Sequence, residues 1–212
     1  MKIGIIGASG KAGNLILKEA VERGHEVTAI IRDASKLVDQ RVAILEKDIF
    51  ALTAADLTVF DVVVNAFGAP LGEEQLLVDA GHALIEALKG SATRAIIVGG
   101  AGSLLVDADK AMTVVETPDF PEVFKATAKG QGRNLQELQA TTDLSWTFIS
   151  PSAIFDADGK RTGTYQAGHD HLLVNSKGDS YISYADYAMA VVDEIENPQH
   201  LNARFTVVAE AN

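Results

Sequence analysis

Three glycines near the start of the chain, Gly7, Gly10 and Gly13, are the residues whose spacing points most clearly to chemistry. They follow a short apolar run, Ile3 to Ile6, and lead into a segment with helical periodicity. A strand, a glycine turn and a helix bring backbone N–H groups and the positive end of a helix dipole together, where a diphosphate can bind. The turn therefore predicts a dinucleotide site, although its spacing is G-x-x-G-x-x-G and Ala8 stands where G-x-G-x-x-G would have a glycine. The alternative is an ordinary turn whose small residues serve packing.

A charged pair follows the next predicted strand. Arg32 and Asp33 come after the apolar segment 26–31, about 20 residues beyond the glycine turn, which is the position that reads the adenosine ribose. An acid there accepts the 2′-hydroxyl of NAD, whereas an arginine accommodates the 2′-phosphate of NADP. Because Arg32 comes first, we expect NADP. Asp33 keeps NAD as an alternative, and Arg32 could instead be a solvated loop charge.

Composition narrows the class of protein. The net charge of −11 disfavours general binding to nucleic acid or to anionic membranes, because both need a basic surface. The chain has no cysteine, which excludes disulfides, thiolate metal sites and thiol nucleophiles. Its 212 residues and 47% apolar content predict one globular domain over residues 1–212. We expect a cytoplasmic protein, since the first strand starts at Lys2 and no apolar run has the length of a membrane helix.

One pair of histidines has a spacing that could suit a metal site. His169 and His171 flank Asp170 and could point to one side of a strand, as a metal site needs. A third ligand is not evident in the sequence, and we therefore expect no metal.

Strands and helices alternate along the chain. The expected strands are residues 3–6, 26–31, 42–45, 61–66, 94–98, 145–149 and 204–208, and the expected helices are residues 12–23, 53–57, 73–88, 121–140 and 184–196. The helix over 121–140 is expected to be interrupted at Gly130 and Gly132. Alternation implies right-handed crossovers, so the sequence predicts an α/β fold with one open, mostly parallel sheet and helices on both faces.

Residues 152–183 interrupt this alternation. We expect a long loop that carries a hairpin, with strands near 172–174 and 181–183 joined by a turn at 175–178. Ligands of open parallel sheets bind beyond the carboxyl ends of the strands. The 152–183 segment is therefore the predicted substrate-side insertion.

Several motifs together resemble those of the atypical short-chain dehydrogenase/reductases. The glycine turn, Arg32, Asp48, the run from Asn65 to Gly68 and Ser150-Pro151 carry the resemblance, which spans nearly the whole chain. Within that group the chain is similar to NAD(P)H-binding proteins of the NmrA-like and NADH-flavin reductase type. The resemblance implies a single-domain Rossmann fold, and its motifs are more specific for that fold than for a reaction.

The resemblance also implies roles for individual residues. The glycine turn would hold the pyrophosphate, Arg32 the adenosine phosphate and Asp48 the adenine amino group. Asp48 could instead be a helix cap or an exposed carboxylate. The implied cofactor contacts are Gly7, Ala8, Ser9, Gly10, Lys11, Ala12, Gly13, Arg32, Asp48, Asn65, Ala66, Phe67, Gly68, Gly100, Ala101, Ser150, Pro151 and Ser152. The implied substrate contacts are Ser103, Phe124, Ala153 and Phe155.

One departure from the typical short-chain dehydrogenases limits the chemistry. Those enzymes use Tyr-x-x-x-Lys, in which the tyrosine is the acid/base and the lysine lowers its pKa, together with a serine after the fifth strand. None of the four tyrosines here, at positions 165, 181, 184 and 187, has a lysine four residues later. Ser103 could match the serine or be a simple turn residue. A reaction that needs no protein acid therefore fits best.

Hydride transfer from NAD(P)H to a flavin meets that condition, because the charge spreads into the flavin ring and water can supply the proton. We therefore expect an NAD(P)H-dependent oxidoreductase acting on FMN, FAD or a related quinone-like acceptor. The alternative is a nucleotide-binding sensor that reports the NAD(P) state to a partner protein. The aromatic residues that could flank a flavin ring, each of them also a plausible core residue, are Phe67, Phe124, Phe155 and Tyr165.

Overall fold

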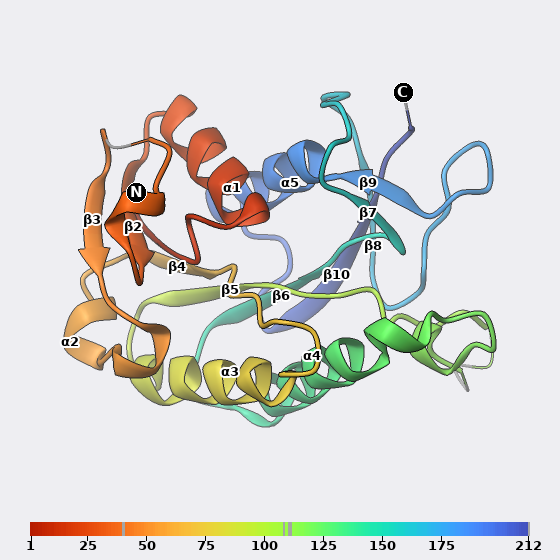
Figure 1. Ribbon diagram of the computed structural model, residues 1–212, viewed down its shortest axis with the longest axis horizontal. Coiled ribbons are helices and arrows are strands. Elements are labelled where there is room, and N and C mark those ends of the chain that lie inside the picture. The colour runs from red at the N-terminus through yellow and green to blue at the C-terminus, as the bar shows by residue number, and fades with distance from the viewer. Residues whose placement is uncertain (40, 108, 110–111, 212) are drawn as a thin grey trace.

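The computed structural model describes residues 1–39, 41–107, 109 and 112–211, and its centre is an eight-stranded sheet between two layers of helices (Figure 1). The strand order is β3-β2-β1-β4-β5-β6-β10-β8, and neighbouring strands are parallel except for β8, which is antiparallel to β10. The sheet strands are β1 (Lys2–Ile6), β2 (Glu26–Ile31), β3 (Ala43–Glu46), β4 (Val62–Asn65), β5 (Arg94–Val98), β6 (Trp146–Ser150), β8 (Gln166–Gly168) and β10 (Ala203–Val208).

Helices cover both faces of the sheet. In Figure 1, α1 and α5 lie together above it, while α3 and α4 lie together below. The α-helices are α1 (Lys11–Glu22), α2 (Ala54–Leu57), α3 (Gln75–Leu88), α4 (Glu122–Ala140) and α5 (Tyr184–Glu196), and the short 3₁₀ helices are η1 (Ala34–Lys36), η2 (Ile49–Ala51) and η3 (Val114–Glu116). The seven strands and five helices that the sequence predicts all have bounds within two residues of the expected ones. The predicted α/β Rossmann architecture is confirmed.

Alternation of side chains along the buried strands builds two cores. In β1, Ile3 and Ile5 face the layer of α1 and α5, whereas Ile6 belongs to the cluster with α3 and α4. The central strands are apolar on both faces because helices cover both of them. Strand order reverses at β1, which has β2 on one side and β4 on the other. An open α/β sheet forms its ligand crevice at such a switch point, outside the carboxyl ends of the strands.

The expected interruption of α4 was wrong, because the helix continues through both glycines. A β-carbon at Gly130 would lie 2.9 Å from the carbonyl oxygen of Glu74, and the glycine therefore lets α4 approach the start of α3 closely. One turn further, Asn134 of α4 packs against Gly81 of α3. The helix-breaking tendency of glycine is offset here by tight helix packing.

The expected hairpin within 152–183 was also wrong. Strand β9 (Tyr181–Ser183) pairs in parallel with β7 (Ile154–Asp156), and β8 extends the main sheet instead. The turn itself is present, because the Asn175 side chain accepts the N–H groups of Lys177 and Asp179. Residues 172–174 form no strand of their own. Within the described residues, no helix is both long and apolar enough to cross a membrane.

Candidate functional site

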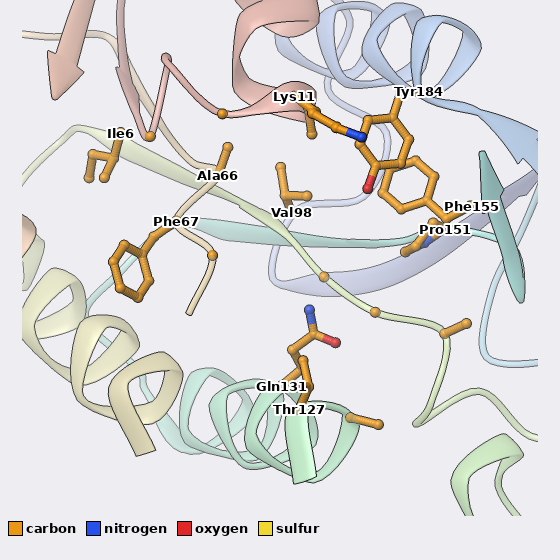
Figure 2. A pocket seen from close by; sticks show the side chains of 18 of the residues that line it. Ile6, Lys11, Ala66, Phe67, Val98, Thr127, Gln131, Pro151, Phe155 and Tyr184 are labelled. Carbon is orange, nitrogen blue, oxygen red and sulfur yellow. The ribbon is translucent and has the colours of Figure 1, made fainter. Parts of the chain in front are cut away.

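A cavity of about 870 Å³ opens at the carboxyl ends of β1, β2, β4, β5 and β6 (Figure 2). Its lining follows the strand exits, from Gly7 after β1 and Arg32 after β2 to Ala66 after β4, Gly99 after β5 and Pro151 after β6. This volume is at the upper end of the roughly 300–1,000 Å³ usual for small-molecule sites. The cavity therefore lies where the topology predicts a ligand and is large enough for an extended one.

The glycine turn forms one end of this cavity. Gly7 has φ of +76°, and a β-carbon there would lie 2.6 Å from the carbonyl oxygen of Ala66. A β-carbon at Gly13 would collide with the carbonyl oxygen of Gly7. The first glycine thus permits the turn, and the third lets α1 lie directly on it.

The first turn of α1 is open to an anion. Its N-cap is Gly10, which has no side chain to bond the leading N–H groups, and the first turn contains no acidic residue. By contrast, the Ser183 hydroxyl caps α5 by accepting the Asp186 N–H at 3.0 Å. Unpaired N–H groups and a helix dipole attract a phosphate. Lys11 adds a positive charge at the cavity wall. These residues fit the diphosphate of a dinucleotide.

Arg32 and Asp33, the charged pair predicted to read the adenosine ribose, follow β2. Arg32 lines the cavity with its side chain 73% exposed, and its Nε is 3.8 Å from Oδ2 of Asp48. Asp33 is engaged elsewhere, because Oδ1 accepts both the hydroxyl and the N–H of Ser35. These hydrogen bonds hold the pKa of Asp33 below its ordinary value. Of the two charged side chains at this position, the one that lines the cavity is therefore that of Arg32.

Three of the predicted contact residues have buried side chains at the strand exits. Asn65 is buried, and its Oδ1 accepts the Phe67 N–H at 3.0 Å, which fixes the backbone after β4. Ser150 is fully buried at the end of β6, while the residues that follow it reach the cavity. The Ser152 hydroxyl donates to the carbonyl of Val207 at 2.7 Å. The side chains of Asn65 and Ser152 therefore position the wall, and the backbone that follows each strand lines the cavity.

Helix α4 supplies the lower wall of the cavity. Phe124, Thr127 and Gln131 are three and four residues apart and line the cavity from one helix face. Figure 2 shows Thr127 and Gln131 pointing up from α4 toward the exit of β5. A β-carbon at Gly100 would collide with the Gln131 amide, so the glycine makes room for it. The Thr127–Gln131 pair gives this wall neutral hydrogen-bonding groups.

Tyr184 and Phe155 form the opposite wall, on the side of α1 and α5 (Figure 2). Their ring centroids are 3.9 Å apart with the planes inclined by 36°. Burial raises the pKa of Tyr184 above that of a free phenol. Tyr165, which was expected to flank a substrate ring, lies outside the cavity because its hydroxyl donates to Asp193 at 2.9 Å.

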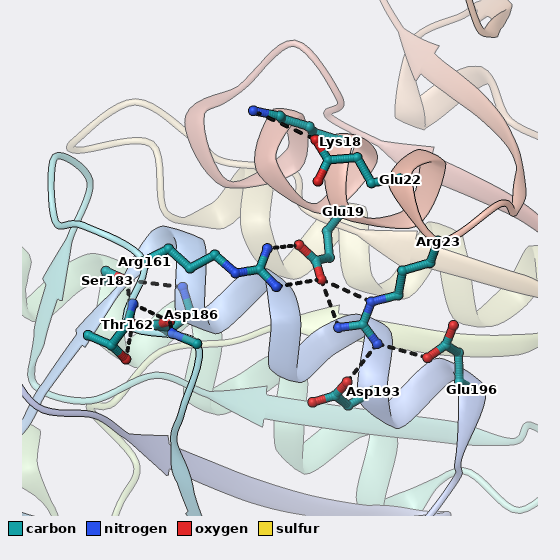
Figure 3. A network of polar contacts seen from close by, with 11 residues as sticks. Lys18, Glu19, Glu22, Arg23, Arg161, Thr162, Ser183, Asp186, Asp193 and Glu196 are labelled. Atoms are coloured by element: carbon teal, nitrogen blue, oxygen red, sulfur yellow. Dashed lines mark hydrogen bonds and ion pairs between the residues drawn. The ribbon is translucent and has the colours of Figure 1, made fainter.

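A polar network joins α1, α5 and the loop after β7 (Figure 3). Glu19 of α1 is 5% exposed and bonds both Arg161 and Arg23. Burial alone would raise the pKa of Glu19, but the hydrogen bonds and charges of the two arginines outweigh it and hold that pKa low. Asp186 of α5 accepts the N–H groups of Thr162 and Gly163. The network thereby ties the loop after β7 to both helices.

The cavity brings together most of the predicted site residues. Those that line it are Gly7, Ser9, Gly10, Lys11, Ala12, Arg32, Ala66, Phe67, Gly68, Gly100, Ala101, Phe124, Pro151, Ser152, Ala153 and Phe155. Those that do not are Ala8, Gly13, Asp48, Asn65, Ser103 and Ser150. Ala8 is fully buried, Asp48 caps η2 by accepting the Phe50 N–H, and the Ser103 hydroxyl accepts a hydrogen bond from Arg204 at 3.1 Å. Within the 152–183 segment, the residues that line the cavity are Ser152, Ala153 and Phe155.

Sequence reasoning missed several lining residues. These include Lys47, Val98, Phe120, Thr127, Gln131 and Tyr184. The spacing of Phe124, Thr127 and Gln131 on one face of the expected helix was an available signal for two of them. Tyr184 had a weaker signal, its position as the first residue of the last helix.

Comparisons with known proteins agree with this geometry. The model of a family described as NAD(P)H-binding matches residues 7–198. YwnB of Bacillus subtilis (strain 168), a protein described as uncharacterized, is 64% identical over the whole of both chains. A solved structure from Streptococcus pneumoniae TIGR4, named as a candidate NADH-flavin reductase, is 44% identical with a TM-score of 0.95 and covers 99% of this chain and 100% of its own. A candidate epimerase from Bacteroides thetaiotaomicron is 32% identical with a TM-score of 0.87, covering 100% of this chain and 98% of its own.

Proposed function

This chain belongs to the NAD(P)H-binding family, and from that premise we propose that it is an NADPH-dependent reductase whose acceptor is a flavin or a related planar molecule. One observation carries the proposal. The cavity does not end at the glycine turn but continues past the exits of β5 and β6 to the wall of Phe155 and Tyr184. A site that only held a nucleotide for sensing would not need that additional space beside the nicotinamide end.

The preference for NADPH rests on the residues after β2. Arg32 is exposed at the cavity, whereas the Asp33 carboxylate is occupied by Ser35. A guanidinium binds a phosphate in a planar, bidentate manner. A carboxylate that already accepts two hydrogen bonds has less capacity left for ribose hydroxyls. Both features favour the cofactor that carries a 2′-phosphate.

The chain's own residues would orient the reactants rather than form bonds with them. When bound, the reduced nicotinamide supplies a hydride. The α1 N-terminus and Lys11 would hold the diphosphate, and the backbone from Gly99 to Ala101 with Pro151 would flank the nicotinamide. The aromatic rings of Phe155 and Tyr184 on one side and Phe124 on the other would hold a planar acceptor and exclude water. Two observations support a flavin as the acceptor: the name of the Streptococcus pneumoniae relative and the space in the cavity beside the aromatic wall.

Steady-state oxidation of the nicotinamide cofactor tests this function. Purified protein is mixed with NADPH or NADH, and cofactor loss is followed with FMN, FAD or no acceptor. We expect acceptor-dependent oxidation that is faster with NADPH than with NADH. Tight NADPH binding together with oxidation that no acceptor accelerates would contradict the reductase and favour a nucleotide sensor.

A further inference from the structure

Tyr184 differs from the other tyrosines in what its hydroxyl contacts. The hydroxyls of Tyr165, Tyr181 and Tyr187 donate to Asp193, to Asp156 and to the carbonyl of Ile149, at 2.9, 2.9 and 2.7 Å. Tyr184 lines the cavity, and among the described residues its hydroxyl has no hydrogen-bond partner. It is therefore the phenol that is available to a bound molecule.

The ring of Tyr184 is held in a fixed position. Tyr184 is the first residue of α5, directly after the capping Ser183. The carboxylate of Asp186, two residues later, is fully buried and accepts the Ser183 hydroxyl at 3.0 Å. On its flat side the ring lies on Phe155, which in turn packs against Tyr187 at 4.8 Å. A group held this way needs little rearrangement to act on a ligand.

The other hydroxyl groups at the cavity are poor candidates for a proton donor. The hydroxyl of Ser152 already donates to Val207. Ser9 and Thr127 carry aliphatic hydroxyls, which are far weaker acids than a phenol. A phenol is protonated at neutral pH, and burial raises the pKa of Tyr184 further, so it can donate a proton but does not act as a base.

We propose that Tyr184 is a catalytic acid and that the site therefore reduces carbonyl compounds as well as flavins. The proposal rests on the proposed function, which supplies the reductant NADPH. The carbonyl carbon gains the hydride and forms a new C–H bond. The π electron pair moves to the oxygen, which takes the phenolic proton of Tyr184, and the tyrosinate recovers a proton from water.

The position of this acid is unusual relative to the typical short-chain dehydrogenases. Their tyrosine and lysine would correspond to residues of the helix after the fifth strand, which here presents Thr127 and Gln131. Tyr184 comes instead from α5, which covers the other face of the sheet. A carbonyl acceptor needs such an acid because reduction would otherwise leave a localised alkoxide. A flavin spreads its charge and has less need of one.

Matched phenylalanine variants test the proposal. Wild type, Tyr184→Phe and Tyr165→Phe are assayed with NADPH and either 4-nitrobenzaldehyde or FMN, and NADPH binding is measured by fluorescence for each. Tyr184→Phe keeps the ring on Phe155 and removes the hydroxyl alone. Tyr165→Phe removes a hydroxyl that bonds Asp193 outside the cavity.

We expect wild type to reduce both acceptors. In Tyr184→Phe, kcat for the aldehyde should fall about 100-fold more than kcat for FMN, in line with the loss of a general acid. The aldehyde rate of wild type should also decline at high pH as the phenol ionises, and this decline should vanish in the variant. Tyr165→Phe should retain both rates.

Three results would overturn the proposal. An equal loss for both acceptors would make Tyr184 a wall residue without an acid role. FMN reduction without any aldehyde reduction in wild type would leave the proposed function intact and remove this inference. NADPH oxidation with neither acceptor would remove both.

Discussion

Oδ1 of Asp33 accepts the hydroxyl of Ser35 at 2.6 Å and its backbone N–H at 3.0 Å, so the carboxylate after β2 caps η1. The acid that would read the ribose of NAD in this fold is therefore turned toward its own loop. Arg32, the preceding residue, remains at the cavity. The preference for NADPH that we propose depends on this division of roles between two adjacent charges.

Replacing Arg32 with alanine should weaken NADPH binding far more than NADH binding. A hydrogen bond to a charged group contributes about 1.5–3 kcal/mol, which corresponds to roughly a 10- to 100-fold increase in the Kd for NADPH. Fluorescence titration with both cofactors measures the effect. Arg41→Ala is the matched control, because Arg41 pairs with Asp39 and comes just before β3, at the opposite end of that strand from Lys47, which lines the cavity. Equal weakening of both cofactors by Arg32→Ala would contradict an arginine that reads the 2′-phosphate.

A methyl group at Gly13 should disrupt the cofactor site. Its β-carbon would collide with the carbonyl oxygen of Gly7, so α1 must shift away from the turn. We expect Gly13→Ala to lose measurable NADPH binding and to be destabilised by about 1–3 kcal/mol, as in other overpacked positions.

Gly132→Ala is the control for that variant, because the nearest atom to its β-carbon would be 4.0 Å away. Gly132 lies within α4, where alanine stabilises a helix by up to about 1 kcal/mol relative to glycine. Thermal unfolding and NADPH titration of both variants make the comparison. Normal cofactor affinity in Gly13→Ala would show that the close contact between α1 and the turn does not define the site.

Removing the charge of Glu19 should destabilise the fold in a pH-dependent way. Glu19 is buried between Arg161 and Arg23, and Glu19→Gln would take this carboxylate from Arg161 while Arg23 keeps Asp193 and Glu196. Loss of one partner from a fully buried ion pair costs about 3–5 kcal/mol, and the cost here should be smaller because the Arg161 side chain is 45% exposed. Urea unfolding at neutral pH measures the difference in free energy of unfolding from wild type.

The sign of the pH effect follows from the lowered pKa of Glu19 in the folded protein. Its stabilisation is complete above the pKa of the unfolded chain and is lost as the pH falls through the folded pKa. Wild type and Glu19→Gln should therefore converge in stability toward acidic pH. Glu22→Gln, on the exposed side of the same helix with Lys18 at 3.9 Å, should change stability little at any pH. A gap between wild type and Glu19→Gln that stays constant down to acidic pH would contradict this role.

The parts of the site that the backbone forms could be predicted from the sequence. Gly7 to Gly13, Ala66 and Pro151 could be predicted because parallel strands present their carboxyl ends at one edge, and the residues after each strand must meet there. The mostly parallel sheet and the helices on both of its faces followed from the alternation of elements. These features depend on local patterns and on the handedness of crossovers.

The side-chain walls could not be predicted in the same way. Tyr184 reaches the cavity because α5 packs beside α1, and Gln131 fits because Gly100 leaves room for it. Such contacts join residues far apart in sequence. The false hairpin has a similar cause: the turn at Asn175 is encoded locally, but the choice of β7 as the partner of β9 depends on the surrounding fold.

The most direct test of the reductase is a single turnover under anaerobic conditions, in which one equivalent of FMN is mixed with the protein and NADPH. The account predicts that NADPH disappears and reduced flavin forms at the same rate, well above that of the protein-free mixture, and that deuterium at the transferred position of the nicotinamide slows both. Formation of the NADPH complex with flavin reduction no faster than in the protein-free mixture would contradict it.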